Sequence, residues 1–528
     1  MKLTSKILGL LITLTVLMPA LAKSNKHCDK NCKEEVVKYV QGGVSAPGNG
    51  TRKHPFSSLL EAQNDRCWDV LIVLPSTVAL DYGITLKPGQ KLIGECNPTR
   101  GLLPTQPTIT NTHSASNGGN GAVVLGDSTI KNIYFKNTYA SAINYDSAND
   151  LVVQDVLITG FDHGTDSISG IQGTCTKSGK TFIERTIIRN DNGGYAGVND
   201  TTANLVGIHR ELTICKCDFS ELSDIGINTG PVGDSTNSSF VVIKDCYFHD
   251  FINLAEIGIS CGGTGGATQI VLVENSRFYN IGGETSHIVG QPSSTSSLKL
   301  KIDSCLFEET SLNGAVAVEV GKRTRDASSE IILENSVSTS LSHFFLSVLA
   351  LNVTVKNKLC GNTVTGGIFY QTGTSQGSTN MEEMTDIIGN VFIGSTGISV
   401  NPGAPYTLLT INLEDNCFSG GNAAGNVGIS SLETTGNTNA GNATITAHCN
   451  SIIDFATDIQ NETHTTINAT ENWWGGLPCA SGSGCVGSQI CQKGVCVGPA
   501  HVINTGGGTV YVMPSLTASI KCPPCCAR

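Results

Sequence analysis

The segment Val241-Val242-Ile243-Lys244-Asp245-Cys246-Tyr247-Phe248 decides the fold, because its pattern recurs about a dozen times along the chain. Each copy has alternating apolar residues, two polar residues, a small or polar residue, and an aromatic or aliphatic residue two positions later. The residues aligned with Phe248 are Phe135, Ile158, Ile188, Phe219, Phe278, Phe307, Ser338, Cys360, Phe392, Phe418, Ile452 and Trp474. From Ile158 to Ser338 the spacings are 30, 31, 29, 30, 29 and 31 residues. Such a period predicts a solenoid, whose turns bury their apolar faces against one another.

The polar step inside each copy predicts a sharp bend between two strands. Asn or Asp often stands three positions before the aligned residue, as at Asn132, Asp155, Asp245, Asn275, Asn335 and Asn357. These side chains tolerate the left-handed backbone that such a bend requires. Two or three short strands per turn predict an all-β protein with the architecture of a parallel β-helix. A β-propeller needs blades of about 40 residues, and spacings as short as 22 residues exclude it.

The repeats from Ser128 to Gly475, the lead-in from Gly48 to Gly94 and the closing Asn472-Trp473-Trp474-Gly475 resemble the pectin-lyase-like superfamily. The resemblance implies a right-handed parallel β-helix, which we place at residues 101–475. That superfamily includes lyases, glycosidases, epimerases, adhesins and proteins without known activity. The fold therefore does not select a function by itself.

The N-terminus has the pattern of a signal peptide over residues 1–22. Lys2 and Lys6 precede the apolar stretch 7–17, and Ala20-Leu21-Ala22 is a small-residue cleavage site. The apolar stretch is short for a membrane span, so no span is expected in the mature chain. The predicted location is secreted, periplasmic or at the cell surface.

Residues 23–100 are expected to form an N-terminal cap and the first coils of the β-helix. Val36, Val37 and Val40 lie on one helical face, so a short helix is predicted over residues 28–40. Cysteines are expected to staple this cap, namely Cys28, Cys32, Cys67 and Cys96. Trp474 is expected to plug the opposite end of the β-helix.

Residues 476–528 are predicted to be a small cysteine-rich C-terminal module. The chain has 20 cysteines, and an exported chain of this kind forms disulfides readily. Four cysteines fall within a Gly- and Ser-rich stretch and are expected to form two local disulfides: Cys479, Cys485, Cys491 and Cys496. No metal site is predicted there, because zinc pairs usually have closer spacing.

Two interior ladders are expected at the position two residues before the aligned column. Cys217, Cys246 and Cys305 are predicted to be small buried core residues rather than disulfide partners. Ser336 and Lys358 come next in this column, and four asparagines follow: Asn390, Asn416, Asn450 and Asn472. Stacked amides that satisfy one another are expected there, and the resemblance implies such a ladder as well.

Candidate binding residues lie two positions after the aligned column, where each strand ends. They are Glu221, Asp250, Asn280 and Glu309, and a second acidic cluster in neighbouring loops consists of Asp162, His163, Asp166 and Asp191. Carboxylates on successive turns lie close enough to perturb one another's pKa or to share a cation. Polar residues at solvent-facing turns are also the ordinary composition of any β-helix.

The composition and motifs favour binding over catalysis. With 44 acidic against 33 basic residues, the formal net charge is −11, which disfavours nucleic acid as a partner. Asp162-His163-Gly164 is the nearest match to polygalacturonase-like motifs, and no paired-Asp or Arg-x-Lys segment accompanies it. The leading hypothesis is recognition of a polysaccharide, cell-surface glycan or host component along one face without catalysis. The alternatives are a polysaccharide lyase or glycoside hydrolase in the same groove, and a structural surface layer. No cofactor is expected for the binding hypothesis. Under the lyase alternative, calcium is the expected cofactor.

Overall fold

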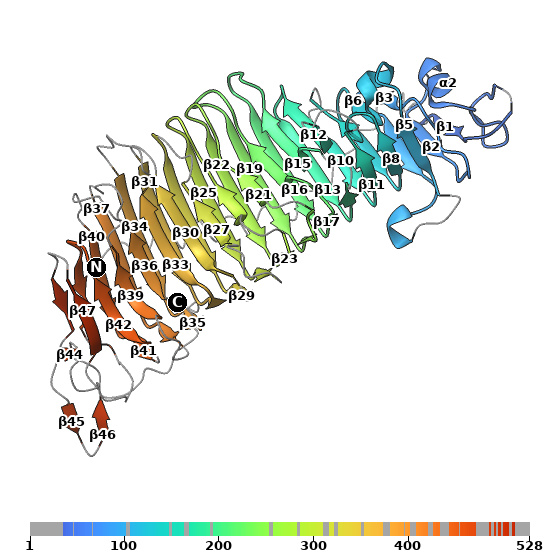
Figure 1. The fold of residues 1–528 in the computed structure, drawn as a ribbon. Helices are drawn as coiled ribbons and strands as arrows, with labels where there is room; N and C mark the ends of the chain where they lie inside the picture. The colour runs from blue at the N-terminus through green and yellow to red at the C-terminus, as the bar shows by residue number, and fades with distance from the viewer. Residues whose placement is uncertain are drawn as a thin grey trace, which may run out of the picture. The chain divides into compact units, whose positions relative to one another are not determined.

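The structure is a computed structural model of the whole chain, and it divides into residues 1–36 and the unit Val37–Arg528. The residues described are 35–512, without 46, 66, 102–105, 147–149, 163–167, 191–193, 253–256, 282–285, 310–315, 322–325, 340, 350–352, 373–380, 395–396, 402–407, 421–425, 433–442, 454, 471, 473–484, 487–489, 493–494, 498–499 and 506–508. Within these residues the protein is a parallel β-solenoid with three sheets, as Figure 1 shows. From β4 to β42, each turn passes once through each sheet.

The first sheet of each turn has the longest strands and is called the long-strand sheet. Its strands are β1 (Val37–Val40), β2 (Val70–Val73), β4 (Lys91–Gly94), β7 (Ser128–Lys131), β10 (Leu151–Gln154), β13 (Gly179–Glu184), β16 (His209–Cys215), β19 (Ser238–Lys244), β22 (Thr268–Glu274), β25 (Ser297–Asp303), β28 (Ser328–Glu334), β31 (Val353–Cys360), β34 (Met381–Ile388), β37 (Leu408–Glu414), β40 (Ala443–His448), β43 (Thr466–Asn468) and β48 (Val510–Tyr511). Alternate residues face the core, and the others face outward.

The second sheet is called the short-strand sheet, because most of its strands have three residues. They are β5 (Thr108–Asn111), β8 (Tyr134–Thr138), β11 (Leu157–Phe161), β14 (Ile187–Arg189), β17 (Asp218–Ser220), β20 (Tyr247–His249), β23 (Arg277–Tyr279), β26 (Leu306–Glu308), β29 (Val337–Thr339), β32 (Thr363–Thr365), β35 (Val391–Ile393), β38 (Cys417–Ser419) and β41 (Ser451–Ile453). Only the middle residue of a three-residue strand points into the core.

The connecting sheet leads from each short strand to the next long strand. It contains β3 (Ile84–Leu86), β6 (Ala122–Val124), β9 (Ile143–Asn144), β12 (Ser169–Cys175), β15 (Ala196–Thr202), β18 (Ile225–Gly230), β21 (Ile257–Cys261), β24 (Ser286–Gly290), β27 (Val316–Val320), β30 (His343–Leu349), β33 (Gly367–Thr372), β36 (Ile398–Asn401), β39 (Val427–Ser431), β42 (Thr457–Asn461), β47 (Ala500–Asn504) and β44 (Cys485–Val486). β44 pairs antiparallel with β47, whereas the other pairings in this sheet are parallel.

The predicted repeat is confirmed over most of its length. Register pairing aligns Phe219, Phe248, Phe278 and Phe307 on adjacent short strands. The first three of these rings stack 4.8 Å apart in the core. The predicted bend is confirmed too, because the residue three positions earlier has a left-handed backbone on eight consecutive turns: Asn132, Asp155, Arg185, Lys216, Asp245, Asn275, Ser304 and Asn335.

The predicted alignment is wrong at one turn. Val364, and not Cys360, pairs with Ser338 and Phe392 in the short-strand sheet. Asn357 lies in the interior of β31, where it is buried, instead of at a bend. The alternation of buried residues continues through β31 to Leu359, so the strand is longer than the repeat predicts.

The corrected alignment lengthens the asparagine ladder and removes Lys358 from it. Asn362 takes that place: its Oδ1 accepts from the Ser336 amide, and its own amide donates to Asn390 Oδ1, both at 2.9 Å. The same contact repeats between consecutive members of the row through Asn390, Asn416, Asn450 and Asn472, at 2.8 to 2.9 Å.

The cysteines that precede this ladder are buried thiols, as predicted. Cys217, Cys246 and Cys305 are free and 2% exposed. Each donates its S–H to carbonyl oxygens of the long-strand sheet.

The ends of the solenoid differ in part from the expected caps. Val37–Val40 is strand β1, paired in parallel with β2, and not part of a helix. Its β-branched and aromatic residues favour a strand. The only α-helix among the described residues is α2 (Leu59–Asn64), and η2 (Pro98–Arg100) and η3 (Ser116–Gly119) are 3-10 turns. None of the helices described there is long and apolar enough to cross a membrane.

The predicted cysteine staples fall partly outside the described residues. Cys67 and Cys96 are free thiols, so they do not staple the cap to each other, and Cys28 and Cys32 are not described. Near the C-terminus, β45 (Ile490–Gln492) and β46 (Val495–Val497) form an antiparallel pair that places Cys491 opposite Cys496. Cys479 and Trp474 lie outside the described residues, so their roles stay predictions.

Candidate functional site

A cluster of aromatic and charged side chains covers the outer face of four short strands, β17, β20, β23 and β26. Their middle phenylalanines point inward and pack in the core. The first and third residues of these strands therefore lie on the outer face, where all but Ser220 are at least partly exposed. We call this surface the tyrosine patch and define it by the outward residues Asp218, Tyr247, His249, Arg277, Tyr279 and Glu308.

His249 lies at one side of the tyrosine patch, between two carboxylates. Its Nδ1 is 2.9 Å from Asp250 Oδ2, and its Nε2 is 3.3 Å from Asp218 Oδ1. Its ring stacks on that of Tyr247, with the centroids 4.1 Å apart. Contacts at both nitrogens and at the ring face hold the imidazole in one orientation.

Arg277 lies at the centre of the patch and connects its two tyrosines. Its guanidinium carbon is 5.1 Å from the centre of the Tyr247 ring and 5.3 Å from that of Tyr279. Its Nε donates to Glu308 Oε2 at 2.7 Å. An arginine in this geometry makes cation–π contacts and an ion pair together, so the patch is ordered before any ligand binds.

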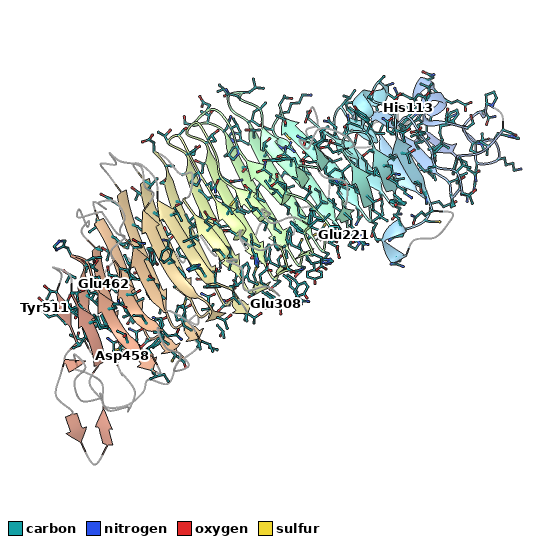
Figure 2. The ribbon with its side chains drawn as sticks, in the orientation of Figure 1. His113, Glu221, Glu308, Asp458, Glu462 and Tyr511 are labelled. Carbon is teal, nitrogen blue, oxygen red and sulfur yellow. The ribbon has the colours of Figure 1, made fainter. Side chains whose placement is uncertain are left out.

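Three of the predicted binding residues border this patch. Asn280 Nδ2 donates to Asp250 Oδ1 at 3.2 Å, so these two neighbours on successive turns do meet as expected. The Glu221 amide donates to the Asp250 carbonyl at 3.2 Å, which places Glu221 on the adjacent turn. Figure 2 shows Glu221 and Glu308 along the same edge of the solenoid.

Two other predicted residues turn away from solvent. Glu309 is buried, and its Oε1 lies 2.7 Å from His287 Nε2 and accepts from the Ile281 amide. Asp162 is buried as well, with its Oδ2 accepting from the Ile168 amide at 3.0 Å. Both carboxylates hold loop backbone in place. His163, Asp166 and Asp191 lie outside the described residues.

The electrostatics of the patch suit recognition of hydroxyl groups. The hydrogen bond from His249 lowers the pKa of Asp250, with a further contribution from Asn280. A lowered pKa keeps this carboxylate ionised, and an ionised carboxylate accepts hydrogen bonds from hydroxyl donors. Among the described residues, no group of three or more His, Cys, Asp or Glu side chains is placed to hold a metal ion.

The outward residues of the patch are not among the residues predicted from the sequence, although the sequence contains a signal for them. The predicted residues follow each strand, whereas the patch residues stand on either side of the buried phenylalanines. Those positions must face outward when Phe248 and Phe278 face inward. Aromatic residues there, Tyr247 and Tyr279, are therefore half-buried on the outer face of the sheet instead of in the core, which is an informative feature.

Comparisons with known proteins add distant structural similarities only. Protein-family models and curated proteins both give no match. Among solved structures, the chain is similar to DFA-IIIase from Arthrobacter chlorophenolicus A6 without its lid, with a TM-score of 0.32 and 11% identity over 66% of this chain and 83% of that chain. The same enzyme in complex with GF2 gives a TM-score of 0.29 and 10% identity over 74% of this chain and 84% of that chain. The function of the chain therefore rests on its own residues.

Proposed function

We propose that the protein is an exported carbohydrate-binding β-solenoid that holds a glycan against the tyrosine patch without cleaving it. The observation that carries this proposal is the outward array of Tyr247, Arg277 and Tyr279 on rigid neighbouring strands. His249 and Arg277 already lie against these rings, so the rings offer their remaining apolar surface to a sugar, while the adjacent carboxylates accept from its hydroxyls. Neighbouring strands are about 4.8 Å apart, so the rings would contact successive parts of one extended chain.

Binding fits the patch better than glycoside hydrolysis does. A glycosidase needs one carboxylic acid with a raised pKa beside a second carboxylate. Here the pKa of Asp250 is lowered by His249. Burial does raise the pKa of Asp200, Asp224 and Glu383. Asp200 and Glu383 are buried in the core, and the half-buried Asp224 precedes β18 of the connecting sheet and is not one of the outward residues that define the patch.

Removing either tyrosine is expected to weaken glycan binding about tenfold or more, equivalent to about 1.4 kcal/mol, as for aromatic residues at the centre of binding sites. A glycan array with wild-type protein would select the ligand. Calorimetry with that ligand would then compare Tyr247→Ala and Tyr279→Ala with wild type. The same samples would be assayed for unsaturated products and new reducing ends.

Tyr511→Ala is the matched control, because Tyr511 is an exposed tyrosine on β48, outside the patch. Its affinity should equal that of wild type. The proposal fails if wild type binds no glycan, or if both patch variants bind as tightly as the control. Product formation that Asp250→Asn abolishes would replace the binding proposal with the enzymatic alternative.

A further inference from the structure

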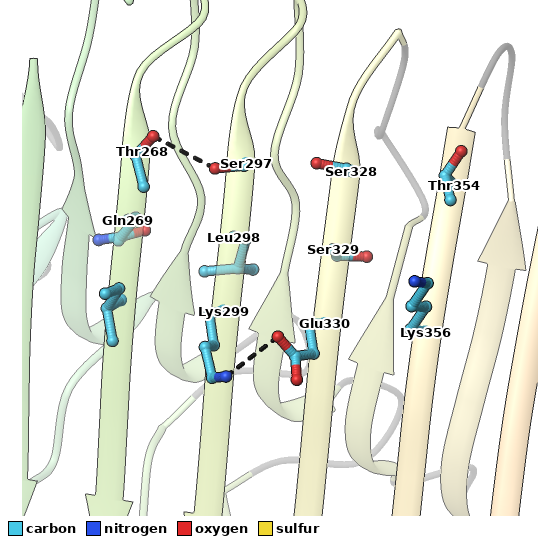
Figure 3. A pocket seen from close by; sticks show the side chains of 11 residues that line it. Thr268, Gln269, Ser297, Leu298, Lys299, Ser328, Ser329, Glu330, Thr354 and Lys356 are labelled. Carbon is cyan, nitrogen blue, oxygen red and sulfur yellow. Dashed lines mark hydrogen bonds and ion pairs between the residues drawn. The ribbon is translucent and has the colours of Figure 1, made fainter. Parts of the chain in front are cut away.

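A groove of about 420 Å³ crosses the outer face of the long-strand sheet, over β22, β25, β28 and β31. Figure 3 shows the side chains that line it on four successive strands. One rim carries a row of hydroxyls, Thr268, Ser297, Ser328 and Thr354, which register pairing places side by side. These residues belong to a different sheet from the tyrosine patch.

Two lysines line the same groove, and two more lie in the next outward row beside it. Lys299 and Lys356 occupy one outward row, with Glu330 between them on β28. Lys301 and Lys358 occupy the next outward row, on the same two strands. The two lysines of each row are two strands apart, which is roughly 10 Å along the solenoid. These four lysines lie beside three carboxylates, Asp303, Glu330 and Glu334, so the local charge is weakly positive in a chain with a net charge of −11.

Nearby carboxylates form ion pairs with three of these lysines, but not with Lys356. Lys299 Nζ is 3.1 Å from Glu330 Oε2, and Lys301 Nζ is 3.1 Å from Glu334 Oε2. Lys358 Nζ is 3.8 Å from Glu334 Oε1. Lys356 is exposed and has no ion pair with any residue that the structure describes.

We propose that this groove binds a linear anionic polysaccharide, with its carboxylate or sulfate groups on Lys356 and Lys299 and its hydroxyls on the Ser/Thr row. Lysine ammonium groups bind either anion as point charges. The Ser/Thr row supplies donors and acceptors that match sugar hydroxyls. The acidic surface elsewhere opposes a nucleic acid, whose charges are more closely spaced. This second site is independent of the tyrosine patch.

The test measures binding of the full chain to three probes: dextran sulfate, polygalacturonate and neutral dextran. Wild type is expected to bind one or both anionic probes, with an affinity that falls as salt is added, and not to bind neutral dextran. The double variant Lys299→Ala/Lys356→Ala should lose about tenfold or more in affinity. Glu330→Gln should bind more tightly, because it releases Lys299. A gain of affinity cannot come from misfolding.

Lys180→Ala is the matched control. Lys180 lies in the same outward row and pairs with Glu211 at 2.7 Å, but it is on β13, outside the groove. It should bind as wild type does. The proposal is overturned if wild type binds neither anionic probe, if the double variant matches this control, or if duplex DNA binds more tightly through the same lysines. Tyr247→Ala should leave anionic binding unchanged, which separates a failure of this site from a failure of the tyrosine patch.

Discussion

Replacing Asn416 with alanine is expected to destabilise the C-terminal turns by about 3 to 5 kcal/mol, since each buried polar group left unsatisfied costs about 1–3 kcal/mol. The Asn416 Oδ1 accepts from both the amide and the Nδ2 of Asn390, at 2.9 and 3.0 Å. Its Nδ2 donates to the Ile387 carbonyl at 2.7 Å and to Asn450 Oδ1 at 2.9 Å. Native-state hydrogen exchange of β35 to β41 would measure the loss locally, because a solenoid need not unfold in one step.

Two further variants make this result interpretable. Asn412→Ala removes an amide from the outer face of the same turn, where its Nδ2 donates to Asp386, and should cost about 1 kcal/mol or less. The loss of stability for Asn416→Ser should lie between the losses for Asn416→Ala and Asn412→Ala. Serine already occupies the same row at Ser336, where its Oγ accepts from the Cys305 amide. Equal losses for Asn416→Ala and Asn412→Ala would mean that the ladder does not stabilise these turns.

The sequence predicted this ladder and the repeat because both depend on local periodicity. An inward phenylalanine or asparagine recurs at nearly constant spacing, and stacking of identical turns preserves it. The prediction failed at β31, where Asn357 faces the core and takes the place of an apolar residue. Its Nδ2 donates to Glu383 Oε1 at 2.7 Å on the next strand. Asn357 can be buried because its hydrogen-bond partner lies on another turn. One copy of the repeat does not contain both partners, so its sequence does not predict the pair.

The candidate site was less predictable for a related reason. Glu309 has the same position in its turn as Glu221 and Asp250, yet it is buried against His287. Glu309 pairs with one histidine on β24, 22 residues earlier in the chain, whose ring lies beside the stacked rings of Phe278 and Phe307. The position of a residue in the repeat therefore predicts that it follows a strand. Whether its side chain is exposed depends on the residues of the connecting sheet that pack against it.

The core carboxyl of Glu383 is expected to make the folded state less stable as the pH rises from about 4.5 to about 7. Burial raises its pKa from 4.5 to about 7, against the opposing hydrogen bonds of Ser347 and Asn357. Below pH 4.5 the carboxyl is protonated in both states, so it has no effect on the free energy of unfolding. Between the two values only the folded state keeps the proton, and stability falls with pH. Above about pH 7 the ionised carboxyl lowers the free energy of unfolding by about 3 kcal/mol relative to pH 4.

Glu383→Gln should abolish this dependence, because the amide keeps the shape and an oxygen for Asn357 but has no charge. We expect the variant and wild type to be similarly stable at pH 4, and the variant to be more stable at pH 8 by up to about 3 kcal/mol. Urea denaturation across this range would measure the difference. Glu382→Gln is the matched control, because the side chain next to Glu383 in β34 points to solvent, and its profile should follow that of wild type. Parallel profiles for Glu383→Gln and wild type would show that the buried carboxyl does not titrate in this range, and that Asn357 and its neighbours hold it ionised in the core.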